Sequence, residues 1–412
     1  MNRIIKILLA FSPGLFAIGY TIGTGSVTAM IVAGNQFGMG LLWVLVFSCI
    51  FTGMLIYVSG NYYLITGETA LYAVRKHLPM GKFLAISILV AIGVGQWNSL
   101  IGILGITSNV IFEILEINFP WLAEYEYAVV LVLAIFIIGT FYGLLIKGSF
   151  SLFEKVLALF VSVMGLSFIF TLFFVYPLPS EIIQGLIPEI PEVEGAGILL
   201  AAFVGTTMAA ATFVSRPLFI QGKGWSISDL DKQKSDSIIA SILIFTISGA
   251  IMAVASGSLH GEGKEITHVL DMSEVLEPSV GKFAVSIFFA GTLSAGLSSI
   301  FPCLMIVPLM LGDYTAGELD IKSRRFKLIT GVASICALSV PVFGFNPIKG
   351  QIFAQVVNVF ALPLVVYVFL ILWNRKNVGL PKRRWVSNAV MLGAFIFSLI
   401  ISWNGLSDIF GW

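Results

Sequence analysis

Long apolar segments alternate with short polar connections along almost the whole chain. They fall at residues 12–34, 41–65, 83–112, 128–146, 153–175, 197–220, 237–257, 281–311, 327–344, 350–373 and 386–404. A helix needs about 20 apolar residues to cross the hydrocarbon core of a bilayer. The pattern therefore predicts an all-α polytopic membrane protein with eleven spans.

The composition indicates the same class of protein. Hydrophobic residues make up 58% of the chain and charged residues 11%, whereas globular domains are about a quarter charged. The formal net charge is +1, which leaves no basic surface for nucleic acid. We expect an integral protein of the cell (inner) membrane that is monomeric in the lipid bilayer.

Lysine and arginine orient the predicted spans, because cytoplasmic loops carry the excess of these residues. With the N-terminus inside, Lys264, Lys282 and Lys349 fall outside, Arg216 lies within a span, and the rest of the 23 basic residues fall inside. This predicts a cytoplasmic N-terminus and a C-terminus outside. Arg216 stands near the inner end of its span, so we expect its side chain to snorkel to the membrane surface.

Two predicted spans carry glycine and hydroxyl residues at their middle, Gly19–Thr28 in the first and Gly205–Thr212 in the sixth. Glycine in a helix costs about 1 kcal/mol relative to alanine, so neither stretch favours an unbroken helix. These spans occupy matching positions in two five-span halves, 1–175 and 197–373, which 386–404 follows as an additional helix. Interrupted helices at matching positions of inverted repeats indicate a binding site. Close packing of small residues explains the same composition.

The residues of common catalytic sites are missing at membrane depth. We expect no Asp or Glu in the interior of any span, and His77, His260 and His268 fall in or beside loops. The three cysteines lie far apart in apolar runs, so we interpret them as packing residues. The sequence therefore does not favour an enzyme, and no catalytic residue is assigned. Neutral polar residues expected to face inward are Gln96, Asn98, Asn109, Gln351, Gln355 and Asn358.

Short blocks of sequence follow one another in a characteristic order. They are Ser12–Gly14, Val32–Gly34, Leu41–Trp43, Thr66–Gly67, Leu152–Leu157, Gly291–Ser299, Asn346–Lys349, Ala354–Val357, Leu362–Pro363 and Trp373–Arg375. Together they resemble the Nramp family of proton-coupled divalent metal transporters. This resemblance implies the LeuT-like fold of 5+5 inverted repeats, here with an eleventh helix.

The chain departs from that family at the metal site. The family's metal-binding Asp-Pro-Gly-Asn of helix one corresponds here to Gly23, Thr24, Gly25 and Ser26. The Met-Pro-His of helix six corresponds to Ala209, Ala210 and Ala211, and acidic positions of helix three fall near Trp97 and Leu100. The resemblance implies a substrate site formed by Tyr20, Gly23, Thr24, Gly25, Ser26, Thr206, Thr207, Ala209 and Gln355. Ser26 and Gln355 are the side chains left as candidate metal ligands.

Loss of the anionic ligand changes the expected substrate. Mn²⁺ and Fe²⁺ sites use carboxylate, amide and soft sulfur ligands, whereas Mg²⁺ keeps several of its waters. We therefore expect an alternating-access secondary transporter for a cation, with largely hydrated Mg²⁺ favoured over Mn²⁺ or Fe²⁺. Proton coupling loses its titratable groups, and a tryptophan at Ser26 should plug the cavity.

Two other functions remain open at this point. One is a sodium-coupled symporter of a small neutral or anionic organic solute, in which Thr292, Ser298 and Ser299 form a monovalent-ion site between helices one and eight. The other is a sensor or scaffold that no longer transports, although no signalling domain is attached. No cofactor is expected, and the candidate coupling ions are Na⁺ and H⁺.

Overall fold

The computed structural model describes residues 12–147, 150–191, 193, 195–260, 269–343, 346–375 and 384–411. Every regular element in these ranges is a helix. Ten helices are long and apolar enough to cross a membrane, and the bent pair α2 (Ser12–Thr21) and α3 (Thr24–Phe37) makes eleven. This agrees with the predicted fold class. The part of the first predicted repeat that precedes Ser12 lies outside the described residues, and so do Lys264 and His268.

The remaining helices follow in chain order. They are α4 (Leu42–Thr66), α5 (Ala70–His77), α6 (Gly81–Asn118), α7 (Glu126–Ile146), α8 (Phe150–Leu172), α9 (Pro179–Gln184), α10 (Ala196–Thr207), α11 (Ala210–Lys223), α12 (Leu230–Leu259), α13 (Val269–Ala316), α14 (Arg324–Ala337), α15 (Ser339–Phe343), α16 (Pro347–Asn374) and α17 (Trp385–Phe410). Two short 3₁₀ turns, Pro120–Tyr125 and Ile227–Asp229, precede α7 and α12.

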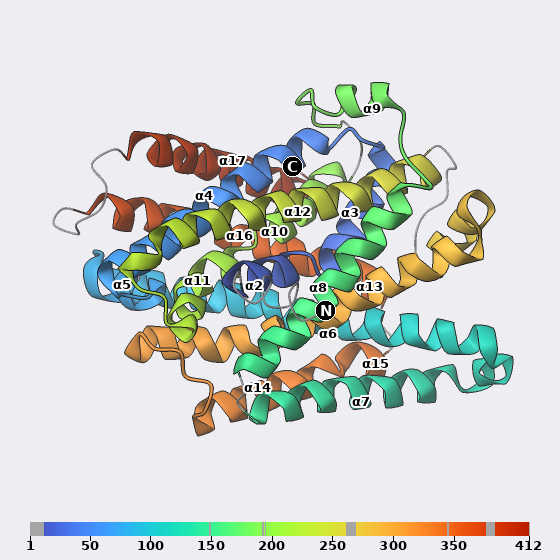
Figure 1. Cartoon of the computed structure of the whole chain (residues 1–412), viewed down its shortest axis with the longest axis horizontal. Helices are drawn as coiled ribbons and strands as arrows, with labels where there is room; N and C mark the ends of the chain where they lie inside the picture. The colour runs from blue at the N-terminus through green and yellow to red at the C-terminus, as the bar shows by residue number, and fades with distance from the viewer. Residues whose placement is uncertain are drawn as a thin grey trace.

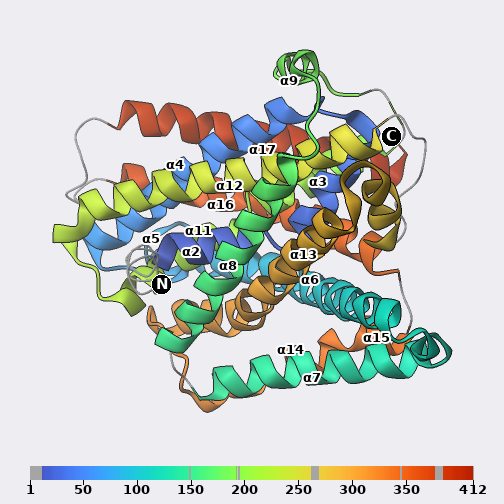
Figure 2. The same cartoon turned by 45° about the vertical axis from the view of Figure 1, so that its right-hand side comes forward.

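The interrupted helices lie at the centre of the bundle. In Figure 1, α7 and α14 lie at one edge and α17 at the other, with α2 and α11 between them, and Figure 2 shows the same order. The most apolar stretch of α10–α11 is 94% buried, against 33% for α7 and for α17. The central helices are therefore shielded from lipid by the others.

Close approaches between helices bring the polar side chains of α6 and α16 to these interruptions. Helix α6 packs along both α13 and α16, and α16 also packs against α10. At Gly205 the α10 backbone comes so near α16 that a Cβ would overlap the Gln355 carbonyl group. Only glycine fits at this crossing, and it sets Gln355 beside the end of α10.

Several helices extend beyond the spans expected from hydropathy, and in two of them the extension carries an acidic residue. Helix α12 begins at Leu230 rather than 237, and α13 ends at Ala316 rather than 311. These extensions place Asp236 and Asp313 inside helices, with 1% and 0% of their surface exposed. The expectation that no acidic residue lies within a span is therefore wrong. Hydropathy ends a span at the first charged residues, but a helix continues where those charges find partners.

Candidate functional site

Both glycine- and hydroxyl-rich stretches are interrupted helices, as their composition predicts. Helices α2 and α3 meet at an angle of 50°, and Gly23 between them has an extended backbone (φ −100°, ψ −169°). Helix α10 ends at Thr207 and α11 begins at Ala210, with Ala209 also extended (φ −62°, ψ 109°). Each interruption leaves backbone N–H and C=O groups without partners in their own helix.

Hydroxyl groups from neighbouring helices satisfy several of these carbonyls. Thr206 Oγ1 donates to the Thr21 carbonyl at 3.0 Å, which joins one interruption to the other. Ser299 Oγ of α13 donates to the Gly19 carbonyl at 2.9 Å, and Thr52 Oγ1 of α4 donates to the Thr207 carbonyl at 2.9 Å. The ends of α2 and α10 at the two interruptions are thus held by direct hydrogen bonds.

A small cavity of about 20 Å³ lies between the interruptions. That is room for about one water molecule. Its lining contains hydroxyl, amide, thiol and glycine positions and no acidic or basic side chain: Tyr20, Gly23, Gly25, Gln96, Ser99, Ile103, Thr206, Ala209, Ser299, Cys303, Gln351, Gln355 and Asn358. The side chains that line it are almost fully buried. The conformation is therefore closed around a neutral site.

A chain of hydrogen-bonded amides forms one wall of the cavity. Gln96 Nε2 donates to Asn358 Oδ1 at 3.1 Å, and Asn358 Nδ2 donates to Gln355 Oε1 at 3.1 Å. Gln355 Nε2 in turn donates to Ser99 Oγ at 3.1 Å. This chain ties α6 to α16 directly beside the interrupted helices, and it supplies neutral oxygen and nitrogen atoms in the place of ionised ligands.

Gln351 connects the same wall to the start of α3. With its amide oriented to satisfy both ends, Nε2 donates to the Ser99 carbonyl at 3.1 Å and Oε1 accepts from the Gly25 N–H at 3.2 Å. That N–H belongs to the first turn of α3, where helical donors lack internal partners. A Cβ at Gly25 would come closer than 3.0 Å to the amides of both Gln351 and Gln355. Glycine is therefore required here for the amides to reach the backbone.

The structure brings six of the nine predicted substrate-site residues to the cavity: Tyr20, Gly23, Gly25, Thr206, Ala209 and Gln355. The other three are buried but do not line it. Thr207 Oγ1 donates to the Phe203 carbonyl of its own helix, and the hydroxyls of Thr24 and Ser26 have no hydrogen-bond partner among the residues that the structure describes. Ser26, one of the two candidate metal ligands, thus does not line the cavity, whereas Gln355, the other, does.

Of the three hydroxyls suggested for a monovalent ion, only Ser299 reaches another helix. Thr292 Oγ1 donates to the Phe288 carbonyl and Ser298 Oγ to the Ala295 carbonyl, both within α13. Ser299 lines the cavity and contacts α2 at Gly19. Of these three residues, Ser299 lines the cavity, and Thr292 and Ser298 do not; the monovalent-ion site stays a prediction.

Sequence reasoning did not assign Ser99, Cys303 or Ile103 to the site, and it expected Gln96, Gln351 and Asn358 only to face inward. The spacing contains the missing signal. Residues 351, 355 and 358 of α16 share one helix face, as do 96 and 99 of α6 and 299 and 303 of α13. Asn98 lies off that face, and its side chain donates to the Val94 carbonyl of its own helix.

Arg216 forms a buried ion pair and does not snorkel. Its side chain is 1% exposed, and its Nη2 donates to Asp236 of α12 and to Gln233. Gln233 Nε2 donates in turn to the Ile56 carbonyl of α4 at 2.9 Å. The expectation of snorkelling is wrong because α12 extends far enough to place a carboxylate beside α11. This pair is separate from the cavity, whose lining it does not join.

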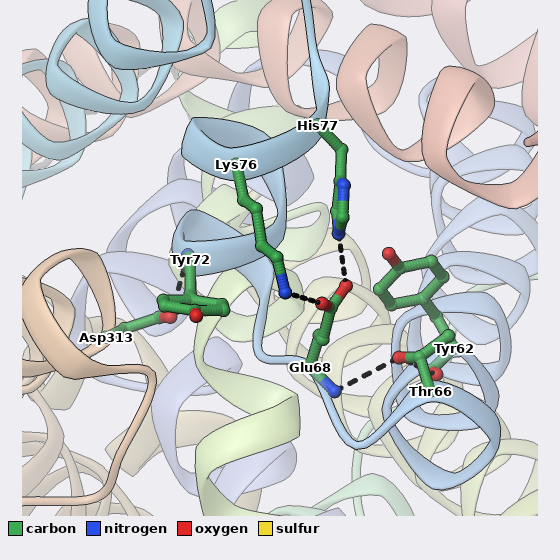
Figure 3. A network of polar contacts seen from close by, with 7 residues as sticks. All are labelled: Tyr62, Thr66, Glu68, Tyr72, Lys76, His77 and Asp313. Carbon is green, nitrogen blue, oxygen red and sulfur yellow. Dashed lines mark hydrogen bonds and ion pairs between the residues drawn. The ribbon is translucent and has the colours of Figure 1, made fainter.

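A second polar network contains Glu68, Lys76, His77 and Asp313 (Figure 3) and lies around α5, whose place in the bundle is seen in Figure 1. Asp313 of α13 accepts hydrogen bonds from Thr69 Oγ1 and from the Leu71 and Tyr72 N–H groups, so it caps the start of α5. Glu68, in the turn before α5, pairs with Lys76 at 2.8 Å and His77 at 2.7 Å.

Two opposing effects set the pKa of Glu68. Burial raises it, but the hydrogen bonds and charges of Lys76 and His77 lower it by more, so the pKa of this carboxyl lies below its ordinary value. The pKa of Lys76 is raised through the same contact. The network therefore fixes the turn between α4 and α5 through an ionised carboxylate.

Comparison with known proteins identifies the family. Residues 14–408 match the family model described as natural resistance-associated macrophage protein-like. The divalent metal cation transporter MntH of Vibrio campbellii is 26% identical, with 98% of this chain and 92% of that protein covered. MntH of Klebsiella pneumoniae is 24% identical, with 98% and 94% covered.

Two solved structures show the same fold. A manganese transporter of Eremococcus coleocola, in complex with an aromatic bis-isothiourea compound, superposes with a TM-score of 0.76 at 15% identity, covering 100% of this chain and 90% of that one. The nucleobase-cation-symport-1 transporter Mhp1 gives 0.61 at 15% identity, covering 97% and 90%. The fold is therefore the LeuT-like inverted repeat. Together with the family match, this shows that the chain is a divergent member of the Nramp family of membrane transporters.

Proposed function

We propose that this protein carries a divalent cation across the membrane by alternating access and that the ion keeps most of its water, which favours Mg²⁺ over Mn²⁺ or Fe²⁺. The class of ion follows from the relatives, which are named as divalent metal cation transporters. The observation that carries the choice among divalent ions is the cavity between the two interruptions, whose lining has no carboxylate.

The energy of dehydration supports this choice. Moving a singly charged ion from water to a medium of low dielectric costs of order 20 kcal/mol, and the cost rises with the square of the charge. Amide and hydroxyl dipoles offset only part of that cost for a bare dication, because none of them carries a net charge. Mg²⁺ dehydrates reluctantly and is bound with several waters in place. A site of neutral groups that hydrogen-bond to those waters suits it.

Movement of the helices is part of the proposal. The closed cavity has room for about one water molecule, so a hydrated ion enters only when α2 or α11 moves away from α6 and α16. We propose that the two five-span halves, 1–175 and 197–373, supply this movement, with the N-terminus in the cytoplasm and the C-terminus outside the cell (inner) membrane. The cavity lining contains no carboxylate or histidine, so we expect flux without obligatory proton coupling.

A sodium-coupled symporter of a small organic solute is the second candidate. It is favoured by Ser299, which joins α13 to the Gly19 carbonyl at the end of α2. It is also favoured by the N-terminus of α3 at the cavity, because such helix ends attract the negative end of a solute. In this alternative, sodium stabilises the α2–α13 contact and no divalent ion is moved.

Flux into proteoliposomes separates the two candidates. Mg²⁺, Mn²⁺ and Na⁺ uptake would be measured in turn, with and without sodium and pH gradients. We expect Mg²⁺ flux that neither gradient is needed to drive, reduced at least tenfold in Gln355→Ala and unchanged in Gln184→Ala, a glutamine on the exposed helix α9. Mn²⁺ transport at micromolar concentration would contradict the proposal. No divalent flux, together with stabilisation by sodium, would favour the symporter.

A further inference from the structure

An open apolar groove of about 310 Å³ runs between α4 and α12 on the outside of the bundle. Isoleucine side chains that are about half exposed form its sides, Ile50 at 51%, Ile238 at 49% and Ile242 at 56%. Its floor includes Gly53, where a Cβ would come within 2.9 Å of the Ser241 Cβ. The glycine therefore lets the two helices approach closely and leaves a depression between the larger side chains. An exposed apolar surface of this kind marks a place where a membrane or another molecule is bound.

The serines of the floor do not make it polar. Ser241 Oγ donates to the Cys49 carbonyl at 2.6 Å, and Ser237 Oγ donates to the Lys234 carbonyl at 2.7 Å. The hydrogen of each hydroxyl is thus used within the protein. The floor is therefore suited to a hydrocarbon chain, because a polar ligand there would leave its own groups without partners.

The two helices run antiparallel along the groove. Gly53 of α4 faces Ser241 of α12, whereas Gly60, later in α4, faces Gln233, earlier in α12. Helix α12 begins at the same end of the bundle as α5 (Figures 1 and 2). The groove therefore starts near this end of the bundle and continues toward the middle of the two helices.

A lysine stands at the outer end of the groove. Lys234 lines the groove together with Tyr57 and is exposed, and among the described residues no carboxylate forms an ion pair with it. Nearby, Lys232 places its Nζ 4.6 Å from the centre of the Trp225 ring. Tryptophan is typical of the membrane–water interface, and lysine extends toward it, so this end of the groove is at the depth of lipid headgroups. Ile242, at the other end, is about 12 Å further along the helix axis.

We propose that this groove binds one anionic phospholipid, whose phosphate contacts Lys234 and whose acyl chain lies along Ile238 and Ile242. Basic groups between spanning helices hold anionic headgroups, and Tyr57 supplies a hydroxyl at the same end of the groove. The apolar sides and the hydrogen-bonded floor suit one hydrocarbon chain. A zwitterionic phospholipid fits the same groove but carries no net charge, so it should bind more weakly.

Native mass spectrometry of the purified protein tests this proposal, with phosphatidylglycerol and phosphatidylcholine of identical acyl chains as the two probes. We expect one phosphatidylglycerol per chain, bound about fivefold more tightly than phosphatidylcholine, which is the ratio that about 1 kcal/mol per lysine gives. Lys234→Gln should bring this ratio close to one, and Lys234→Arg should keep it. Lys82→Gln is the matched control, because this lysine on α6 is also exposed but does not line the groove.

A second pair of variants tests the position of the acyl chain. Ile242→Trp fills the groove and should weaken the binding of both lipids at least tenfold. Ile135→Trp on α7 is its control, because Ile135 is likewise half exposed (50%) and lies outside the groove. Thermal unfolding with each lipid shows whether the variants are folded. It also measures binding independently, since a ligand of the native state raises the unfolding temperature.

Three results would overturn the proposal. They are equal binding of the two lipids by the wild-type protein, an unchanged lipid preference in Lys234→Gln, and lipid binding that Ile242→Trp leaves intact. A dimer that Ile242→Trp dissociates would assign the groove to a second copy of the chain and would also overturn it. None of these measurements involves transport, so their outcome is independent of the proposed function.

Discussion

Gly25→Ala should stop transport while leaving the fold intact, because the added methyl group fills the cavity. The space between the interruptions is about 20 Å³, and the Cβ would come closer than 3.0 Å to the amides of Gln351 and Gln355. Both amides must move, and Gln351 then loses its hydrogen bond from the Gly25 N–H. The variant therefore removes the cavity and its best-defined backbone contact together.

The cost in stability should be small compared with the effect on transport. Overpacking a well-packed site costs roughly 1–3 kcal/mol, and alanine in a helix regains up to about 1 kcal/mol relative to glycine. The net loss is then about 0–3 kcal/mol, so we expect the variant to fold. Transport should fall at least a hundredfold, since the ion no longer finds space between the helices.

Gly143→Ala is the matched control, because nothing lies within 4 Å of the Cβ it would introduce on α7. Mg²⁺ flux into proteoliposomes and thermal unfolding in detergent would be measured for both variants. Wild-type flux in a folded Gly25→Ala protein would refute the cavity as the transport route. Equal loss of flux in both variants would point to a general effect of the substitution and not to the site. Gly25→Ala takes the place of Ser26→Trp as the substitution expected to fill the cavity. Ser26 is fully buried and does not line the cavity, so a tryptophan there would disrupt packing.

Two further predictions concern the charged residues. Arg216→Met should destabilise the protein by about 3–5 kcal/mol by leaving Asp236 buried and unpaired, while Arg216→Met/Asp236→Leu should recover most of that loss; equal unfolding temperatures of the single and double variants would contradict the pairing. Glu68 has a lowered pKa, so its pairing with Lys76 and His77 stabilises the protein above the ordinary pKa of 4.5 and ceases to do so as the pH falls through the lowered value. Glu68→Gln should thus be less stable than wild type at pH 7, by under about 1 kcal/mol, and equal to it in strong acid; a deficit that persists in acid would exclude the ionic contribution.

The positions of the interrupted helices could be predicted because their cause is local. Gly23 and Gly25, with hydroxyl residues around them, stand in the middle of an apolar run, and glycine lowers the stability of a helix at that point. The amide wall has no such local cause. Gln96 and Asn358 meet only because α6 and α16 pack together, and a single sequence does not say which helices are neighbours. The spacing of residues 351, 355 and 358 on α16 was the available signal. It identifies a shared helix face but does not identify the helix that packs against it.

Buried charge could not be predicted for a related reason. Asp236 and Asp313 follow or precede charged and polar residues, so hydropathy assigns them to loops. In the structure Asp236 pairs with Arg216 from another helix, and Asp313 accepts hydrogen bonds from Thr69 and two backbone N–H groups of α5. The helix ends were therefore decided by partners distant in the sequence, which the local pattern does not contain.

These two carboxylates bear directly on the meaning of the neutral cavity. A site without acidic residues could reflect nothing more than the high cost of burying a charge between apolar helices. This protein nevertheless buries Asp236 beside the Arg216 guanidinium, and it buries Asp313 with three hydrogen bonds from Thr69 Oγ1 and the Leu71 and Tyr72 N–H groups. Like the surroundings of Asp313, the cavity offers neutral hydrogen-bonding groups, in Ser99, Gln351 and the Gly25 N–H. The absence of a carboxylate is then a property of this site, and under the proposed function it favours a substrate that crosses without a fixed negative charge beside it.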